Sequence, residues 1–174
     1  MESYDVAVVG GGPIGCFIAE RLAAKGLSIA VIEEHKTIGE PLHCAGLVTN
    51  RIFQITKLPP TSLVQHKISG AHIHAPHGTT LTIGGDKTHA LVINRQQFDQ
   101  TLSQKAQTAG ATLVTEHKVT TAKQHEHHII LDTRHHEHNK KIHCKLLIGA
   151  DGPHSIVRTC FDFPQPTEMI HGIG

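Results

Sequence analysis

The first third of the chain alternates between runs of apolar residues and apolar residues spaced one helical turn apart. Residues 6–9 form an apolar run that ends in a cluster of glycines, which predicts a buried strand followed by a turn. Beyond the turn, Ile14, Ile18 and Leu22 recur on one helical face. Residues 28–32 form a second apolar run and predict another strand. Strand, glycine turn, helix and strand in this order predict an α/β fold.

The glycine turn GGGPIG has the spacing GxGxxG at Gly10, Gly12 and Gly15, with Ile14 inside it. Bare amides at a helix N-terminus behind such a turn bind a pyrophosphate. Glu33 ends the second strand 23 residues after Gly10, where a carboxylate accepts hydrogen bonds from the adenosine ribose. We therefore predict a dinucleotide site rather than a merely structural turn. Glu33 favours FAD or NAD over NADP, because its charge would repel a 2′-phosphate.

A second turn follows the apolar run near the end of the chain, in LLIGADGPHSIVR at residues 146–158. FAD is longer than NAD and needs a second contact from another strand end of the same sheet. Asp151 can accept a hydrogen bond from a ribityl hydroxyl, Gly152 lets the backbone approach, and Pro153 is expected to start a short helix facing the phosphates. The two turns together favour FAD, whereas this turn alone fits an Asp that merely caps a helix.

The middle of the chain predicts a helix that begins after Asn94 as its cap. Phe98, Leu102 and Ala106 lie at the spacing of one face and are expected to form its buried stripe. Arg95 falls in the first turn, where the helix dipole disfavours a cation. We interpret Arg95 as a contact to the anionic cofactor, with a solvated arginine as the alternative.

Several further segments are expected to be strands: 112–114, 118–122, a hairpin from 126 to 148, 67–75 and 79–83. The hairpin contains many of the 17 histidines of the chain. No HExxH helix or CxxC pair organises these histidines into a ligand set, so a solvated hairpin is favoured over a metal site. We expect no bound metal.

Composition narrows the function classes. The chain has 174 residues, of which 39% are hydrophobic, enough for a globular core. Its 16 basic and 15 acidic residues form no basic stripe, which argues against a nucleic acid partner. We expect no secretory signal, because the first residues lack a basic segment followed by an apolar stretch, and no apolar run reaches the length of a membrane span. Four scattered cysteines favour free thiols and a cytoplasmic location.

Taken together, GGGPIG, the Arg that opens the middle helix and GADGPHSIVR resemble the FAD-binding part of flavin hydroxylases and geranylgeranyl reductases. EEHKTIGEPLHCAGLV, at residues 33–48, resembles the reductases in its acid pair, Ile-Gly, Pro and Cys-Ala-Gly. The resemblance implies a Rossmann-like FAD-binding domain over residues 1–160, with a central parallel sheet and a β-hairpin or meander layer. It also implies that residues 66–93 add edge strands to a substrate-domain sheet, which begins in a truncated form at 161–174.

The resemblance further implies that Cys44, Ala45 and Gly46 contact FAD and that the backbone of Val119 contacts the adenine. The implied activity is reduction of isoprenoid carbon–carbon double bonds, with NAD(P)H or ferredoxin as electron donor and peripheral contact with a membrane. An FAD-dependent monooxygenase and a non-catalytic nucleotide-binding remnant are the alternatives. Cys44 has three interpretations: a buried small hydrophobe, a backbone contact to the flavin, or the acid that protonates the alkene.

Overall fold

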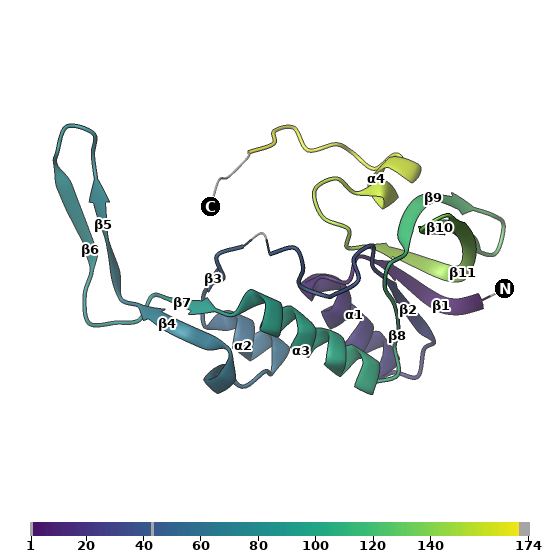
Figure 1. Ribbon diagram of the computed structural model, residues 1–174, viewed down its shortest axis with the longest axis horizontal. Helices are drawn as coiled ribbons and strands as arrows, with labels where there is room; N and C mark the ends of the chain where they lie inside the picture. Colours follow the sequence, from purple (N-terminus) through teal and green to yellow (C-terminus); the bar gives the residue numbers. More distant parts are fainter. Residues whose placement is uncertain (1, 43, 171–174) are drawn as a thin grey trace. The chain divides into compact units, whose positions relative to one another are not determined.

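The structure is a computed structural model that describes residues 2–42 and 44–170 (Figure 1). It contains two compact units. The first unit consists of Met1–Pro41 and Asp99–Ile173, and the second unit consists of Leu42–Phe98. The second unit is therefore an insertion in the sequence of the first, and each unit is described below on its own.

A six-stranded sheet forms the centre of the first unit, in the order β8-β2-β1-β11-β10-β9. The strands β8, β2, β1 and β11 run parallel, whereas β11, β10 and β9 form an antiparallel meander. The bounds of the strands are β1 Glu2–Val9, β2 Ile29–Ile32, β8 Thr112–Val114, β9 Lys118–Gln124, β10 Ile129–His135 and β11 His138–Gly149. The long strand β11 thus belongs both to the parallel sheet and to the meander.

Helices α1 (Pro13–Ala23) and α3 (Arg95–Thr108) begin where the sequence predicts, at the glycine turn and after Asn94. Gly12 is the N-cap of α1. The side chain of Asn94 accepts a hydrogen bond from the Gln97 N–H at 3.0 Å, which confirms the predicted cap of α3. A third helix, α4 (Ile156–Cys160), is short.

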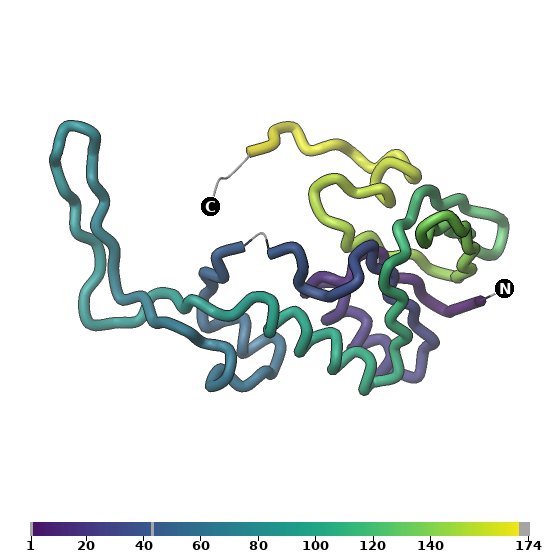
Figure 2. The backbone as a smooth tube through the Cα atoms, viewed as in Figure 1, coloured from purple at the N-terminus to yellow at the C-terminus, as the bar shows by residue number. Residues whose placement is uncertain are grey.

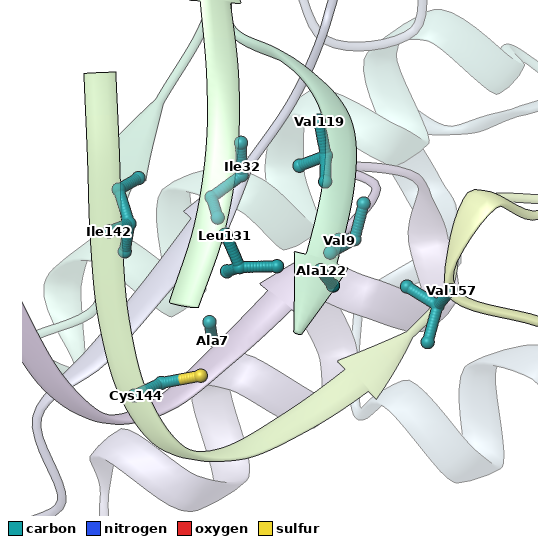
Figure 3. Packing of buried hydrophobic residues seen from close by; sticks show 9 residues of the cluster. All are labelled: Ala7, Val9, Ile32, Val119, Ala122, Leu131, Ile142, Cys144 and Val157. Atoms are coloured by element: carbon teal, nitrogen blue, oxygen red, sulfur yellow. The ribbon is translucent and has the colours of Figure 1, made fainter. Parts of the chain in front are cut away.

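Alternate residues of β1 face two separate hydrophobic clusters in the first unit. Val6 and Val8 pack with alanines of α1 and α3 in one cluster. Ala7 and Val9 pack in the other against residues of the meander, including Leu131, which is fully buried (Figure 3). The unit therefore has helices, parallel strands and a meander as successive layers, and the predicted α/β fold with a meander layer is confirmed.

The second unit contains a three-stranded sheet in the order β3-β7-β4. Strands β5 and β6 form a separate hairpin, whose course can be followed in the backbone tube of Figure 2. Its elements are β3 Leu47–Val48, α2 Arg51–Thr56, the short 3-10 helix η1 Pro60–Ser62, β4 Val64–Ile68, β5 Gly70–His74, β6 Thr80–Gly84 and β7 Ala90–Ile93. Buried Phe53, Leu63 and Leu91 belong to this unit. Every residue of β5 and β6 is exposed.

The prediction of one strand over 67–75 was wrong, because the chain changes sheet after Ile68. A Cβ at Gly70 or Gly84 would overlap the backbone of the opposite strand, so the hairpin closes tightly where it leaves the sheet. Within the described ranges, no helix is both long enough and apolar enough to cross a membrane.

Candidate functional site

The structure brings the two predicted turns side by side in the first unit. The glycine turn follows β1 and the second turn follows its parallel neighbour β11. The Ala150 N–H donates a hydrogen bond to the Val9 carbonyl oxygen at 2.8 Å. Gly10 has a φ of +102°, and a Cβ on it would overlap the carbonyl oxygen of Ala150. Only glycine therefore allows the two turns to approach this closely.

The three glycines of the GxGxxG spacing have different surroundings. A Cβ on Gly15 would overlap the Gly10 carbonyl oxygen, so this glycine allows α1 to pack on the turn. Gly12, by contrast, has no atom within 4 Å of a would-be Cβ. As the N-cap of α1 it makes no side-chain cap, and the first turn of α1 contains no acidic residue. Ile14, in this turn, is 64% exposed. Open space above an uncapped helix N-terminus fits a pyrophosphate.

Glu33 lies at the end of β2, and its carboxylate holds the glycine turn. One oxygen accepts a hydrogen bond from the Gly11 N–H at 2.7 Å. The other accepts from the His35 N–H at 2.9 Å and lies 2.6 Å from Nδ1 of the His35 ring. Glu33 lies at the strand end where the sequence predicts it, whereas its contacts with Gly11 and His35 were not predicted. The position of His35 two residues after a strand-ending carboxylate was the available signal.

Val119 lies on β9, at the edge of the sheet, with its side chain buried in the meander cluster. The segment just before it pairs with the end of β2, since the His117 N–H donates to the Glu33 carbonyl oxygen at 2.9 Å. Val119 therefore follows by two residues His117, which is hydrogen-bonded to Glu33. Its contact with the adenine stays a prediction.

Asp151 caps the helix that follows its own turn. Its Oδ2 accepts hydrogen bonds from the N–H groups of Ile156 at 2.7 Å and Val157 at 3.2 Å. Ser155 is the N-cap of α4, so the prediction that Pro153 begins this helix was wrong. Two capping side chains are satisfied only when the helix starts after both of them. Among the described residues, Oδ1 of Asp151 accepts no hydrogen bond.

Gly152 follows Asp151 and has a φ of +75°, with no atom within 4 Å of a would-be Cβ. The backbone is thus accessible at this point of the turn, as expected for a residue that a ligand approaches. The capping interpretation of Asp151 and a contact from its other oxygen to FAD are compatible, because they use different atoms.

Four further predicted site residues lie in the second unit. Cys44 and Ala45 are exposed, which rules out the interpretation of Cys44 as a buried hydrophobe. Gly46 has a φ of +77°, and its carbonyl oxygen accepts a hydrogen bond from the Ile93 N–H at 2.9 Å. A Cβ on Gly46 would lie 3.4 Å from Cγ of Arg95. Gly46 therefore lies close to Arg95, the first residue of α3.

Two other cysteines, Cys16 and Cys144, are buried, whereas Cys44 is exposed. Burial raises the pKa of the Cys16 thiol to about 11, and its Sγ donates to the Gly11 carbonyl oxygen at 3.1 Å. Burial likewise raises the pKa of the Cys144 thiol to about 11. A thiol with so high a pKa is a poor nucleophile at neutral pH.

The histidines of the meander stack instead of converging. The rings of His125 and His128 lie 5.1 Å apart and those of His128 and His143 lie 5.3 Å apart, both close to parallel. Ring nitrogens point within the ring plane, so stacked rings do not direct them at a common point. In the described part of the chain, no group of three or more His, Cys, Asp or Glu side chains could hold a metal ion.

Comparison with known proteins gives one family and a consistent set of relatives. Residues 3–173 match the family described as FAD binding domain. A digeranylgeranylglycerophospholipid reductase of Methanococcus vannielii is 31% identical over 90% of this chain and 40% of its own length. A digeranylgeranylglycerophospholipid reductase of Methanococcoides burtonii is 35% identical over 90% of this chain and 39% of its own length. The chain thus spans about two fifths of these relatives.

Solved structures share the fold. The crystal structure of a geranylgeranyl bacteriochlorophyll reductase-like protein from Thermoplasma acidophilum has a TM-score of 0.78 and 28% identity, over 88% of this chain and 40% of that one. The p-nitrophenol 4-monooxygenase of Pseudomonas putida also has a TM-score of 0.78, with 18% identity over 92% of this chain and 44% of that one. At that identity the likeness to the monooxygenase concerns the fold alone.

Proposed function

This chain belongs to the FAD binding domain family, and from that premise we propose that it is the flavin-binding part of a reductase of isoprenoid carbon–carbon double bonds. FAD is the cofactor. The open space above Gly12, at the uncapped N-terminus of α1, is the observation that carries the proposal for binding. The identity of 31% and 35% to the two digeranylgeranylglycerophospholipid reductases supports the reaction class, over a monooxygenase that shares only the fold.

The residues of the glycine turn suit the pyrophosphate of FAD. Gly10 and Gly15 keep the turn tight, Gly12 leaves room for the phosphates, and Ile14 supplies a backbone amide in the first turn of α1. We assign the ribose of the adenosine to Glu33, whose carboxylate is oriented by hydrogen bonds from neighbouring N–H groups.

We assign the ribityl part of FAD to Asp151 and Gly152. The Oδ2 atom of Asp151 is used by α4, which fixes the side chain and leaves Oδ1 to accept from a ribityl hydroxyl. A contact of Val119 with the adenine, and of Cys44, Ala45, Gly46 and Arg95 with the cofactor, are further parts of the proposal and rest on the sequence.

When bound, FAD supplies the hydride equivalent for reduction of a carbon–carbon double bond. The other carbon of the alkene needs a proton, and Cys44 is our candidate donor. Its thiol is exposed, whereas the thiols of Cys16 and Cys144 are buried. The partners that follow from this proposal are a hydrophobic isoprenoid lipid, an electron donor such as NAD(P)H or ferredoxin, and a membrane contacted at its surface. The proposal also includes a cytoplasmic location and a substrate domain that begins at 161–174. Residues 171–174 lie outside the described part of the chain.

An FAD titration followed by flavin fluorescence tests the proposal. The variant Gly12→Val places a side chain in the space above α1, where its Cβ meets no protein atom within 4 Å, and we expect it to weaken FAD binding by at least about tenfold. Gly85→Val is the matched control, because Gly85 also has no atom within 4 Å of a would-be Cβ. Equal affinity of the two variants, or no saturable binding by the unmodified chain, would overturn the proposal.

A further inference from the structure

The second unit contains a cavity of about 560 Å³ that none of the predicted FAD contacts lines. Its volume falls in the usual range for small-molecule sites, about 300 to 1,000 Å³. Pro60, Val64 and Leu91 supply apolar surface to its lining. Leu91 is buried and Val64 is half-buried, so these two side chains form the floor, while the exposed Pro60 lies at the rim.

The polar part of the lining contains one cation and three neutral groups. Lys67 is the one charged side chain among the described residues that line the cavity, and the hydroxyls of Thr61 and Thr88 and the amide of Asn50 are the neutral groups. Within the described part of the chain, none of these four side chains has a hydrogen bond or ion pair. All four are exposed and available to a ligand.

The sheet register places the cation beside the apolar floor. Lys67 on β4 is paired directly with Leu91 on β7, so the two side chains project from the same face of the sheet. An ammonium group at the edge of an apolar surface is matched by a ligand that carries an anionic head on an apolar body.

We propose that this cavity binds an amphiphilic anion, with its phosphate or carboxylate head at Lys67 and its apolar chain over Leu91 and Val64. The two threonine hydroxyls and the asparagine amide can donate to the remaining oxygens of the head. A metal cation is disfavoured, because the described lining offers no carboxylate and places a positive charge there. A purely apolar ligand would leave the ammonium without a partner. The proposal is independent of the reductase activity.

Binding of n-octyl phosphate to the chain saturated with FAD, measured by isothermal titration calorimetry, tests the proposal. Excess FAD keeps the phosphate of the probe from the N-terminus of α1. We expect one site, with affinity reduced at least about tenfold in Lys67→Met and largely retained in Lys67→Arg. Inorganic phosphate and 1-octanol should each bind at least about tenfold more weakly than n-octyl phosphate, because the first lacks the apolar chain and the second lacks the anionic head.

Lys87→Met is the matched control, since Lys87 precedes Thr88 in the chain but does not line the cavity. An equal loss of affinity for n-octyl phosphate in both methionine variants would mean that any nearby positive charge attracts the probe, and it would overturn the proposal. The proposal would also be overturned if n-octyl phosphate did not bind to the unmodified chain. None of the predicted FAD contacts lines the cavity, so Lys67→Met should bind FAD like the unmodified chain. Loss of n-octyl phosphate binding with FAD binding retained would therefore concern this cavity and not the flavin site.

Discussion

The turn after β1 and the turn after β11 lie side by side, yet each uses its carboxylate differently. Glu33 reaches the first turn from β2, a separate strand, and accepts from the Gly11 N–H at 2.7 Å. Asp151 belongs to the second turn itself and accepts from the Ile156 N–H five residues later at 2.7 Å. The first turn is thus held by tertiary contacts and the second by a local cap.

The glycines repeat this difference. Gly10 and Gly15 would overlap backbone atoms if they carried a Cβ, whereas Gly152 has open space around it. Sequence changes in the first turn should therefore affect the whole first unit. Changes in the second turn should affect mainly α4 and whatever binds beside it.

The largest difference in unfolding free energy is expected when one methyl group is added to either turn, in two separate variants. Gly10→Ala forces a Cβ onto the Ala150 carbonyl at a φ of +102°, and we expect it to lower the free energy of unfolding by roughly 3 kcal/mol. Gly152→Ala, at a φ of +75° with open space, should cost about 1 kcal/mol. Urea unfolding followed by circular dichroism measures both, since the chain has no Trp. Equal losses would contradict the comparison.

Removing each carboxylate should give the next largest difference. Glu33→Ala deprives the N–H of buried Gly11 and the N–H of exposed His35 of a charged acceptor, and we expect a loss of about 2 kcal/mol in unfolding free energy. Asp151→Ala removes a helix cap and should cost about 1 kcal/mol. Glu34→Ala, which breaks only the exposed ion pair with Lys118, is the control and should change little.

Hydrogen exchange separates the two carboxylates further. Asp151→Ala should speed exchange of the α4 amides and leave those of β1 unchanged, because the cap is local. Faster exchange in β1 would show that the second turn is coupled to the sheet as tightly as the first.

Thiol labelling compares the helices that follow the two turns. In a Cys44→Ser background at about pH 8, we expect Cys160 of α4 to react with a disulfide reagent at least about tenfold faster than Cys16 of α1. Cys16 is buried, donates to Gly11 and has a pKa raised to about 11, whereas Cys160 is half-buried. Cys144, whose pKa burial also raises to about 11, serves as the protected reference. Labelling of Cys16 first, measured by mass spectrometry, would contradict this order.

The smallest effect concerns an ion pair that joins the strands beneath the two turns. Lys145 on β11 lies 2.7 Å from the Asp5 carboxylate on β1, and this contact, followed by hydrogen bonds from Ser28, holds the pKa of Asp5 well below its usual 3.8. A lowered folded-state pKa stabilises the fold fully at pH values above the ordinary pKa of the carboxyl group. This contribution declines below the ordinary pKa and is lost as the pH falls through the lowered one.

Asp5→Asn should therefore unfold at a slightly lower urea concentration than the unmodified chain at pH 6, and this gap should narrow at pH 3, which lies below the ordinary pKa of an aspartate. The difference between the two pH values is the measurement, and Lys145→Gln should reproduce it. A variant effect that is equal at both pH values would mean that the carboxylate charge is not involved.

Secondary structure could be predicted from the sequence where residues close together in the chain determine it. The caps and the buried stripe of α3 follow from Asn94, Phe98, Leu102 and Ala106, and the last three are nearly inaccessible to solvent. The start of α4 was placed wrongly at Pro153, because Asp151 and Ser155 both compete to cap it and the sequence does not show which amides they reach.

By its own spacing, the sequence determined the strand, glycine turn, helix and strand at the start of the chain, because φ, helical periodicity and capping depend on residues a few positions apart. Only the tertiary structure decided that Glu33 binds the Gly11 N–H, that Ala150 lies against Gly10 and that Lys67 faces Leu91. These pairs depend on strand order and register. Such pairing is set by packing across the whole sheet and not by any one segment.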